Sequence, residues 1–135
     1  MEKKPKILVV GSFVMDQIET DVRMTRDGEL VLIHDATVDR TTNGTGKVAD
    51  KLFSELRTLD AGSHKGEQFA SERIPTLEEL MELVKDHPTL TLDIELKEYP
   101  STAGNETRAY EVCDRVLEMI DRYGFSERVV INSFS

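Results

Sequence analysis

The stretch that decides the fold is Ile18-Glu19-Thr20-Asp21-Val22, which a short segment separates from Leu30-Val31-Leu32-Ile33-His34-Asp35. Apolar and acidic residues alternate in the first run, as in a strand with one buried face, so Glu19 and Asp21 point to the same side. The connecting residues 24–28 end in Asp-Gly. A connection this short predicts an antiparallel hairpin, because a parallel crossover needs about a dozen residues or more.

Folding about this turn is expected to bring His34 level with Glu19 and Asp21. Two carboxylates and an imidazole then form one small cluster on adjacent strands. Carboxylate oxygens are the ligands that Mg²⁺ and Ca²⁺ prefer, and a histidine beside the ion can transfer a proton. From these residues alone, a solvated strand face with a structural histidine is the alternative interpretation.

The composition is typical of one globular domain: the 135 residues are 39% hydrophobic and 32% charged. A net charge of −9 argues against nucleic acid or an anionic membrane as a partner. The single cysteine, Cys113, excludes an internal disulfide and favours a reducing compartment. No segment approaches the roughly 20 apolar residues of a membrane span, and no signal-peptide cleavage site follows the first apolar run. We therefore expect a cytoplasmic protein.

Helices and strands alternate in the rest of the chain, which predicts an α/β fold. Thr76 and Glu79 have the spacing of a capping box, and the helix they begin ends at His87-Pro88. Its predicted buried face is Leu77, Leu80, Met81 and Val84. The longest predicted helix, 106–123, has Ala109, Val112, Cys113, Val116, Leu117 and Ile120 as its predicted inward face. The other predicted elements are a short helix in 52–59 and strands in 89–97 and 128–134.

A series of motifs follows in one order along the chain. They are Glu19-Thr-Asp21, Asp27-Gly28, His34-Asp35, Asp39-Arg40-Thr41-Thr42-Asn43-Gly44, Leu59-Asp60-Ala61-Gly62, Ile74-Pro75-Thr76-Leu77, Ile94-Glu95-Leu96-Lys97 and Ile131-Asn132-Ser133-Phe134. On these motifs, residues 16–135 resemble the glycerophosphodiester phosphodiesterase family. The resemblance implies a TIM-barrel ancestry, with active residues at the carboxyl ends of strands.

The resemblance also implies roles for single residues. Glu19, Asp21 and Glu95 match the family's divalent-metal ligands, so we expect Mg²⁺ or Ca²⁺ as the cofactor. His34 matches the catalytic histidine that protonates the leaving alcohol, and Lys97 matches a basic residue near the phosphate. A glycerophosphodiester is the expected substrate if the chain is active. A salt bridge between Glu95 and Lys97 at the rim is the alternative for these two residues.

The N-terminal segment does not resemble that family. Its apolar run, residues 6–14, predicts a buried parallel strand, and residues 6–16 resemble the opening strand of ribokinase-like sugar kinases. Only residues 13–17 separate this run from the acidic strand, which leaves no room for a connecting helix. We therefore expect one domain, 1–135, that is a chimera of a foreign strand in 1–15 and a barrel fragment in 16–135. A degenerate natural relative is the alternative.

The family's first catalytic histidine and its neighbouring arginine have no counterpart before Asp16. Loss of one acid–base partner lowers the rate by about 10²–10⁴-fold. We therefore expect an incomplete TIM barrel, a half-barrel fragment that folds, is catalytically inactive and retains divalent-metal binding. The alternative is a weakly active phosphodiesterase that oligomerisation completes, and a sugar-binding module that uses Asp16 is a third. Because a half-barrel leaves apolar edge strands unpaired, we also predict a homodimer or higher homo-oligomer.

Overall fold

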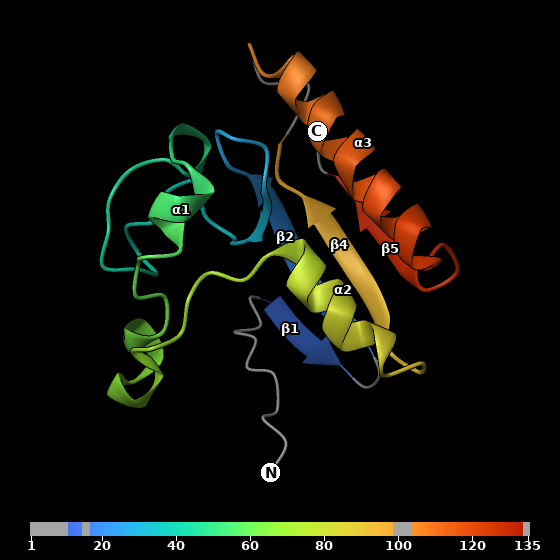
Figure 1. The fold of residues 1–135 in the computed structure, drawn as a ribbon, viewed down its shortest axis with the longest axis horizontal. Coiled ribbons are helices and arrows are strands. Elements are labelled where there is room, and N and C mark those ends of the chain that lie inside the picture. Colours follow the sequence, from blue (N-terminus) through green and yellow to red (C-terminus); the bar gives the residue numbers. More distant parts are fainter. Residues whose placement is uncertain (1–10, 15–16, 99–103, 134–135) are drawn as a thin grey trace.

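The computed structural model describes residues 11–14, 17–98 and 104–133, through which a sheet of five strands runs (Figure 1). The strands are β1 (Gly11–Val14), β2 (Gln17–Met24), β3 (Leu30–Leu32), β4 (Thr91–Leu96) and β5 (Val129–Asn132). β2, β4 and β5 are parallel neighbours in that order, whereas β1 and β3 both pair with β2 in the antiparallel direction. The predicted α/β fold is thus confirmed.

The predicted hairpin is formed by β2 and β3, with Val22 opposite Leu32 and Met24 opposite Leu30. Its turn contains Gly28 at φ 88°, a left-handed conformation that glycine adopts without steric cost. The Asp27 carboxylate accepts hydrogen bonds from the Thr25 hydroxyl at 2.6 Å and from the Phe53 amide at 2.9 Å. The turn is therefore anchored to helix α1 (Phe53–Leu56) as well as closed locally.

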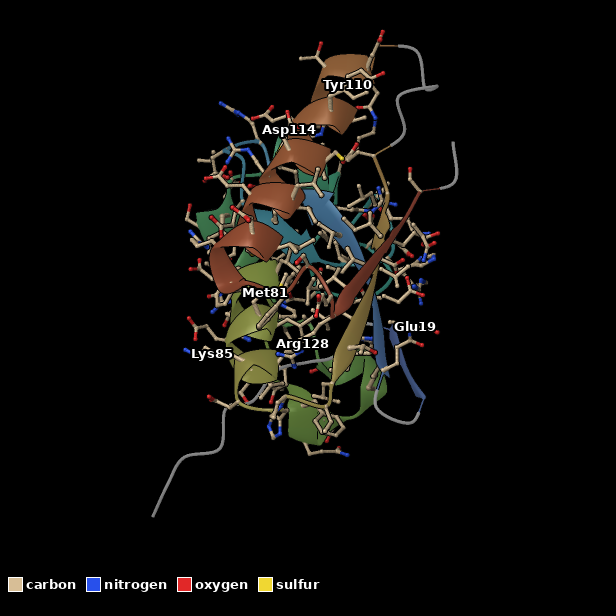
Figure 2. The ribbon with its side chains drawn as sticks, turned by 90° about the vertical axis from the view of Figure 1, so that its right-hand side faces the viewer. Glu19, Met81, Lys85, Tyr110, Asp114 and Arg128 are labelled. Carbon is tan, nitrogen blue, oxygen red and sulfur yellow. The ribbon has the colours of Figure 1, made fainter. Side chains whose placement is uncertain are left out.

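Two longer helices, α2 (Leu77–Lys85) and α3 (Glu106–Tyr123), connect the parallel strands. The capping box of α2 is present: the Glu79 amide donates to the Thr76 hydroxyl at 3.0 Å, and the Thr76 amide donates to the Glu79 carboxylate at 2.9 Å. Figure 2 shows both helices on one side of the sheet and Glu19 on the other. Because the parallel strands follow one another without reversing direction, successive crossovers of the same hand place both helices on one face, as in a barrel wall.

The main core lies between the sheet and these two helices. Its strand residues are Ile18, Val22, Met24, Leu30, Leu32, Leu92, Ile94 and Leu96, and its helical residues include Leu77, Leu80, Met81, Val84, Val112, Val116 and Ile120. A second core fills the long loop between β3 and α2 and contains Val31, Ile33, Val38, Val48, Leu56, Ala61 and Ile74. Strand β3 joins the two cores, because Val31 and Leu32 point to opposite faces.

Two predictions about packing are wrong. The described part of the first predicted strand, β1, pairs antiparallel with β2, with Val14 opposite Gln17, so it is not a parallel strand. The rest of that run, residues 6–10, lies outside the described residues, as does Asp16. The two strands are adjacent in sequence, and a link of only residues 15–16 allows a hairpin but no parallel crossover.

The second wrong prediction concerns α3. Leu117 is 48% exposed, whereas Met119 is half-buried and packs against the main core. Leu117 lies at one margin of the apolar stripe of α3, on the side away from α2. The side of α3 that faces α2 carries Met119 and Tyr123, and the Tyr123 hydroxyl donates to Glu82 at 2.8 Å. Across the described segments, no helix has both the length and the apolarity needed to cross a membrane.

Candidate functional site

Polar side chains form a row across the three parallel strands, on the face opposite the helices. The strand register places Asp21 beside Glu95, and Glu95 beside Asn132. One step back along the strands, Glu19 lies beside Asp93. Each of these residues alternates with a core residue, so strand periodicity alone keeps them off the helical side. In a barrel this face is the interior, where active residues near strand carboxyl ends lie.

Asp21, Glu95 and Lys97 form the most closely connected group on this face. The Lys97 ammonium lies 2.6 Å from the Glu95 carboxylate and 3.7 Å from that of Asp21. Burial and a hydrogen bond with Glu95 raise the pKa of Asp21 to about 6, although Lys97 opposes this change. The hydrogen bonds from Asp21 and Lys97 lower the pKa of Glu95. At neutral pH the group therefore holds a cation between two adjacent carboxyl groups.

His34 follows β3 and lies at the edge of this group. The β2–β3 pairing ends at Leu32, two residues before His34. Strand pairing therefore does not place His34 opposite Glu19 or Asp21, contrary to the prediction from the turn. The imidazole is 59% exposed and still interacts electrostatically with both Asp21 and Glu95. Its Nδ1 atom lies 2.9 Å from the Asp35 carboxylate.

Arg23 is a residue of this site that sequence reasoning missed. Its guanidinium donates two hydrogen bonds to the His34 carbonyl, at 3.0 and 2.8 Å, and one to the Lys97 carbonyl at 3.5 Å. Arg23 thus ties the segment that carries His34 to the end of β4. The signal for it was present, because Arg23 continues the Glu19 and Asp21 alternation on the same face.

Asp93 and Asn132 were also missed as a pair. The Asn132 side-chain amide donates a hydrogen bond to the Asp93 carboxylate. This contact links β5 to β4 at the residue of the same face that precedes Glu95 on β4. Asn132 belongs to a motif noted in the sequence, but nothing in the sequence names Asp93 as its partner. The contact requires the parallel register of β4 and β5.

The predicted metal ligands, Glu19, Asp21 and Glu95, fit a divalent ion only in part. In the described part of the chain, no three or more histidine, cysteine, aspartate or glutamate side chains converge closely enough to hold a metal, so Glu19, Asp21 and Glu95 do not form a ready-made three-carboxylate site. Asp21 and Glu95 nevertheless fit a cation, because the Lys97 ammonium already lies against both. Their oxygen atoms are the ligand type that Mg²⁺ and Ca²⁺ prefer. The three-ligand set remains a prediction.

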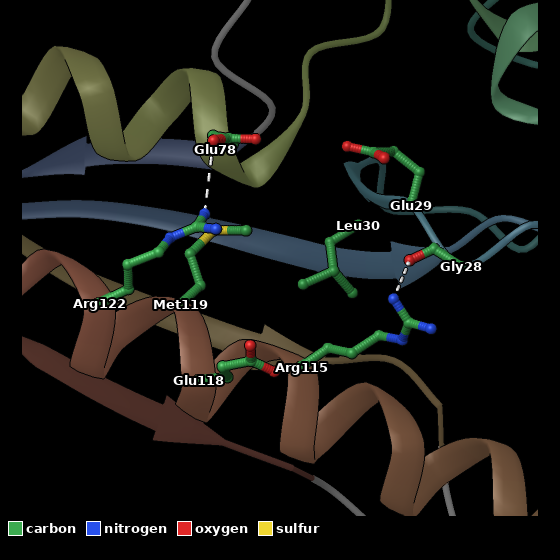
Figure 3. A pocket seen from close by; sticks show the side chains of 8 residues that line it. All are labelled: Gly28, Glu29, Leu30, Glu78, Arg115, Glu118, Met119 and Arg122. Atoms are coloured by element: carbon green, nitrogen blue, oxygen red, sulfur yellow. Dashed lines mark hydrogen bonds and ion pairs between the residues drawn. The ribbon is translucent and has the colours of Figure 1, made fainter.

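A separate cavity of about 180 Å³ lies on the helical side (Figure 3). Arg115 of α3 donates to the Gly28 carbonyl at 3.1 Å, and Arg122 lies 3.4 Å from the Glu78 carboxylate. The remaining lining residues are Glu29, Leu30, Glu118 and Met119. None of the predicted site residues lines this cavity. Its hydrogen bond from Arg115 holds the hairpin against α3, and its ion pair between Arg122 and Glu78 holds α2 against α3.

Comparison with known proteins shows which family the chain belongs to. Residues 13–135 match the glycerophosphoryl diester phosphodiesterase family. The chain belongs to this family. The glycerophosphodiester phosphodiesterase of Caldanaerobacter subterraneus is 47% identical over 124 residues, which cover 89% of this chain and 46% of the relative. That of Bacillus altitudinis is 38% identical over 120 residues, which cover 88% of this chain and 46% of the relative.

Solved structures of glycerophosphodiester phosphodiesterases share the fold. A phosphodiesterase from Oleispira antarctica in complex with the product sn-glycerol-3-phosphate superposes with a TM-score of 0.78 at 31% identity, covering 90% of this chain and 47% of that chain. The glycerophosphodiester phosphodiesterase from Agrobacterium tumefaciens gives a TM-score of 0.73 at 36% identity, covering 89% and 46%. The chain therefore spans about half the length of the relatives it matches.

Proposed function

We propose that this chain supplies the metal-binding carboxylates and the proton donor of a glycerophosphodiester phosphodiesterase site, and that alone it binds a divalent ion but hydrolyses its substrate poorly. The observation that carries the proposal is the placement of Asp21, Glu95 and Lys97 in one group on the barrel-interior face. Family membership and the product named for the Oleispira antarctica structure support glycerophosphodiesters as the substrate class.

In this proposal Asp21, Glu95 and Glu19 would hold Mg²⁺ or Ca²⁺, which when bound polarises a phosphodiester oxygen. Lys97, released from Glu95, places its ammonium group near the phosphate. A water oxygen bonds to phosphorus and releases a proton to solvent, while His34 donates a proton to the oxygen of the departing alcohol as its bond to phosphorus breaks. Arg23 holds the main chain of His34 in place through its carbonyl.

Little or no activity is proposed because the family's first histidine and its arginine have no counterpart in this sequence. A foreign first strand remains part of the proposal, and the resemblance of residues 6–16 to a different family supports it. The degenerate natural relative is the second candidate for the origin of this segment. The proposed lack of activity does not depend on which origin is correct.

We also propose that the chain assembles with a second copy. Strand β5 is an edge of the described sheet, and Val130 on it is 55% exposed on the barrel-interior face. An apolar edge strand favours pairing with another chain, and a two-fold dimer is the commonest closed arrangement. If assembly completes the site, the alternative function, a weakly active phosphodiesterase, becomes the better explanation.

Calorimetric titration with Mg²⁺ and Ca²⁺ tests the metal proposal. Wild type is expected to bind, and Asp21→Asn and Glu95→Gln are expected to lose most of the affinity. Glu118→Gln removes an exposed acid on α3 and serves as the control that retains wild-type binding. Equal affinity in wild type and both site variants would overturn the metal proposal. A turnover assay with glycerophosphodiesters completes the test, since a rate of roughly 1–10³ s⁻¹ would contradict the proposed absence of useful activity.

A further inference from the structure

His34 is held by a chain of contacts that the proposed function does not use. Its Nδ1 atom lies 2.9 Å from Oδ1 of Asp35. Arg40 then donates from Nε to Oδ2 of Asp35 at 2.8 Å and from Nη2 to Oδ1 at 2.9 Å. One carboxylate therefore meets the imidazole on one side and a two-pronged guanidinium on the other, which fixes its plane.

The protonation of this chain follows from its chemistry. Hydrogen bonds from Arg40 and then from His34 hold the pKa of Asp35 well below its usual range, so Asp35 is an ionised carboxylate and can only accept. A neutral imidazole carries one N–H, and the nitrogen that faces a carboxylate must be the one that carries it. The proton of neutral His34 therefore lies on Nδ1, and Nε2 is left with the free lone pair.

We propose that Asp35 is a positioning residue for His34, and that Arg40 is the clamp that holds Asp35 in place. Asp35 fixes the ring tautomer and orientation by holding the Nδ1 proton, so that in the doubly protonated ring Nε2 is the atom that gives its proton to the departing alcohol. After the transfer the ring is neutral and keeps its remaining proton on Nδ1. This proposal rests on the proposed role of His34 as the proton donor.

The contacts are better explained by positioning than by stability. Arg40 is strongly exposed, and exposed ion pairs contribute little to folding. The segment already has other anchors, because Arg23 holds the His34 carbonyl and the Val38 amide donates to the Gly46 carbonyl at 2.9 Å. Removal of Asp35 should therefore leave the fold intact and change the state of the ring.

The test is the tautomer of His34, measured by long-range ¹H–¹⁵N spectra of the full chain labelled at histidine. The three histidines are distinguished by His34→Gln, which removes one set of signals. Wild type is expected to show neutral His34 with its proton on Nδ1, whereas Asp35→Ala is expected to shift it to Nε2. Arg40→Met should give a partial shift. Asp50→Ala removes an exposed acid elsewhere and should leave the wild-type pattern.

An unchanged tautomer in Asp35→Ala, or a proton on Nε2 in wild type, would overturn the proposal. If Asp35→Ala fails to fold, as judged by circular dichroism, the wild-type tautomer and the Arg40→Met spectrum decide the question. The measurement needs neither metal nor substrate. A failed hydrolysis or metal-binding experiment would therefore count against the proposed function while leaving the tautomer result in place.

Discussion

The ammonium nitrogen of Lys97 lies 2.6 Å from a carboxylate oxygen of Glu95, in the group where a divalent ion is proposed to bind. Glu95 and Lys97 are two residues apart on one face of the sheet, and Asp21 lies beside them on β2. The lysine thus offsets part of the negative charge of the two acids in the chain without metal. A divalent ion must compete with this internal cation.

Replacing the lysine should therefore strengthen metal binding. We expect Lys97→Met to raise the affinity for Mg²⁺ or Ca²⁺ by about five- to tenfold, since one unit charge at about 4 Å contributes on the order of 1 kcal/mol even in water. Calorimetric titration measures this. Lys85→Met removes the lysine that pairs with Glu82 on α2. It is the matched control and should bind the ion as wild type does. An unchanged or lower affinity in Lys97→Met would contradict competition between the lysine and the ion.

The raised pKa of Asp21 predicts a pH dependence of stability in the chain without metal. Burial and the Glu95 hydrogen bond raise this pKa from 3.8 to about 6. As the pH rises, the unfolded state therefore releases the Asp21 proton at a lower pH than the folded state does. The stabilisation is therefore complete below pH 3.8 and is lost as the pH rises through about 6. Relative to Asp21→Asn, wild type should lose stability between pH 4 and 7.

Urea unfolding in EDTA, carried out on both proteins at several pH values, checks this dependence. Groups that titrate equally in the two proteins cancel in the difference between their free energies of unfolding. A difference that is flat across this range, or that grows in favour of wild type, would show that the pKa of Asp21 is not raised in solution.

The capping box of α2 predicts a specific stability loss. Thr76 is buried, and its hydroxyl accepts the Glu79 amide at 3.0 Å. Loss of such a cap costs about 1 kcal/mol, so Thr76→Ala should lower the free energy of unfolding by about that amount. Thr107→Ala, at an exposed position of α3, is the matched control and should lose nothing. Equal values for the two variants would mean that the cap contributes nothing measurable.

The assembly proposal predicts a concentration-dependent mass. Sedimentation equilibrium at micromolar concentration should give the mass of a dimer for wild type. Val130→Lys places a charge on the exposed apolar position of β5 and should shift the protein to monomer. Leu117→Lys changes an exposed leucine on the helical side and should remain dimeric. A stable wild-type monomer would show that the β5 edge needs no second copy.

The sequence predicted those features whose cause lies within a few residues. The Asp27-Gly28 turn set the β2–β3 hairpin, the Thr76 and Glu79 spacing set the start of α2, and alternation placed Glu19 and Asp21 on one face. Each depends on backbone geometry that repeats every two or four residues, so a short stretch contains all the necessary information.

Contacts between distant segments were decided by the tertiary structure alone. The cation between Asp21 and Glu95 and the hydrogen bonds from Arg23 to the His34 carbonyl both depend on which strands become neighbours. The same dependence left Leu117 exposed, because α2 packs on the other side of α3. Periodicity predicts which face of a strand or helix a side chain occupies. The residue that contacts this side chain depends on which strands and helices pack together.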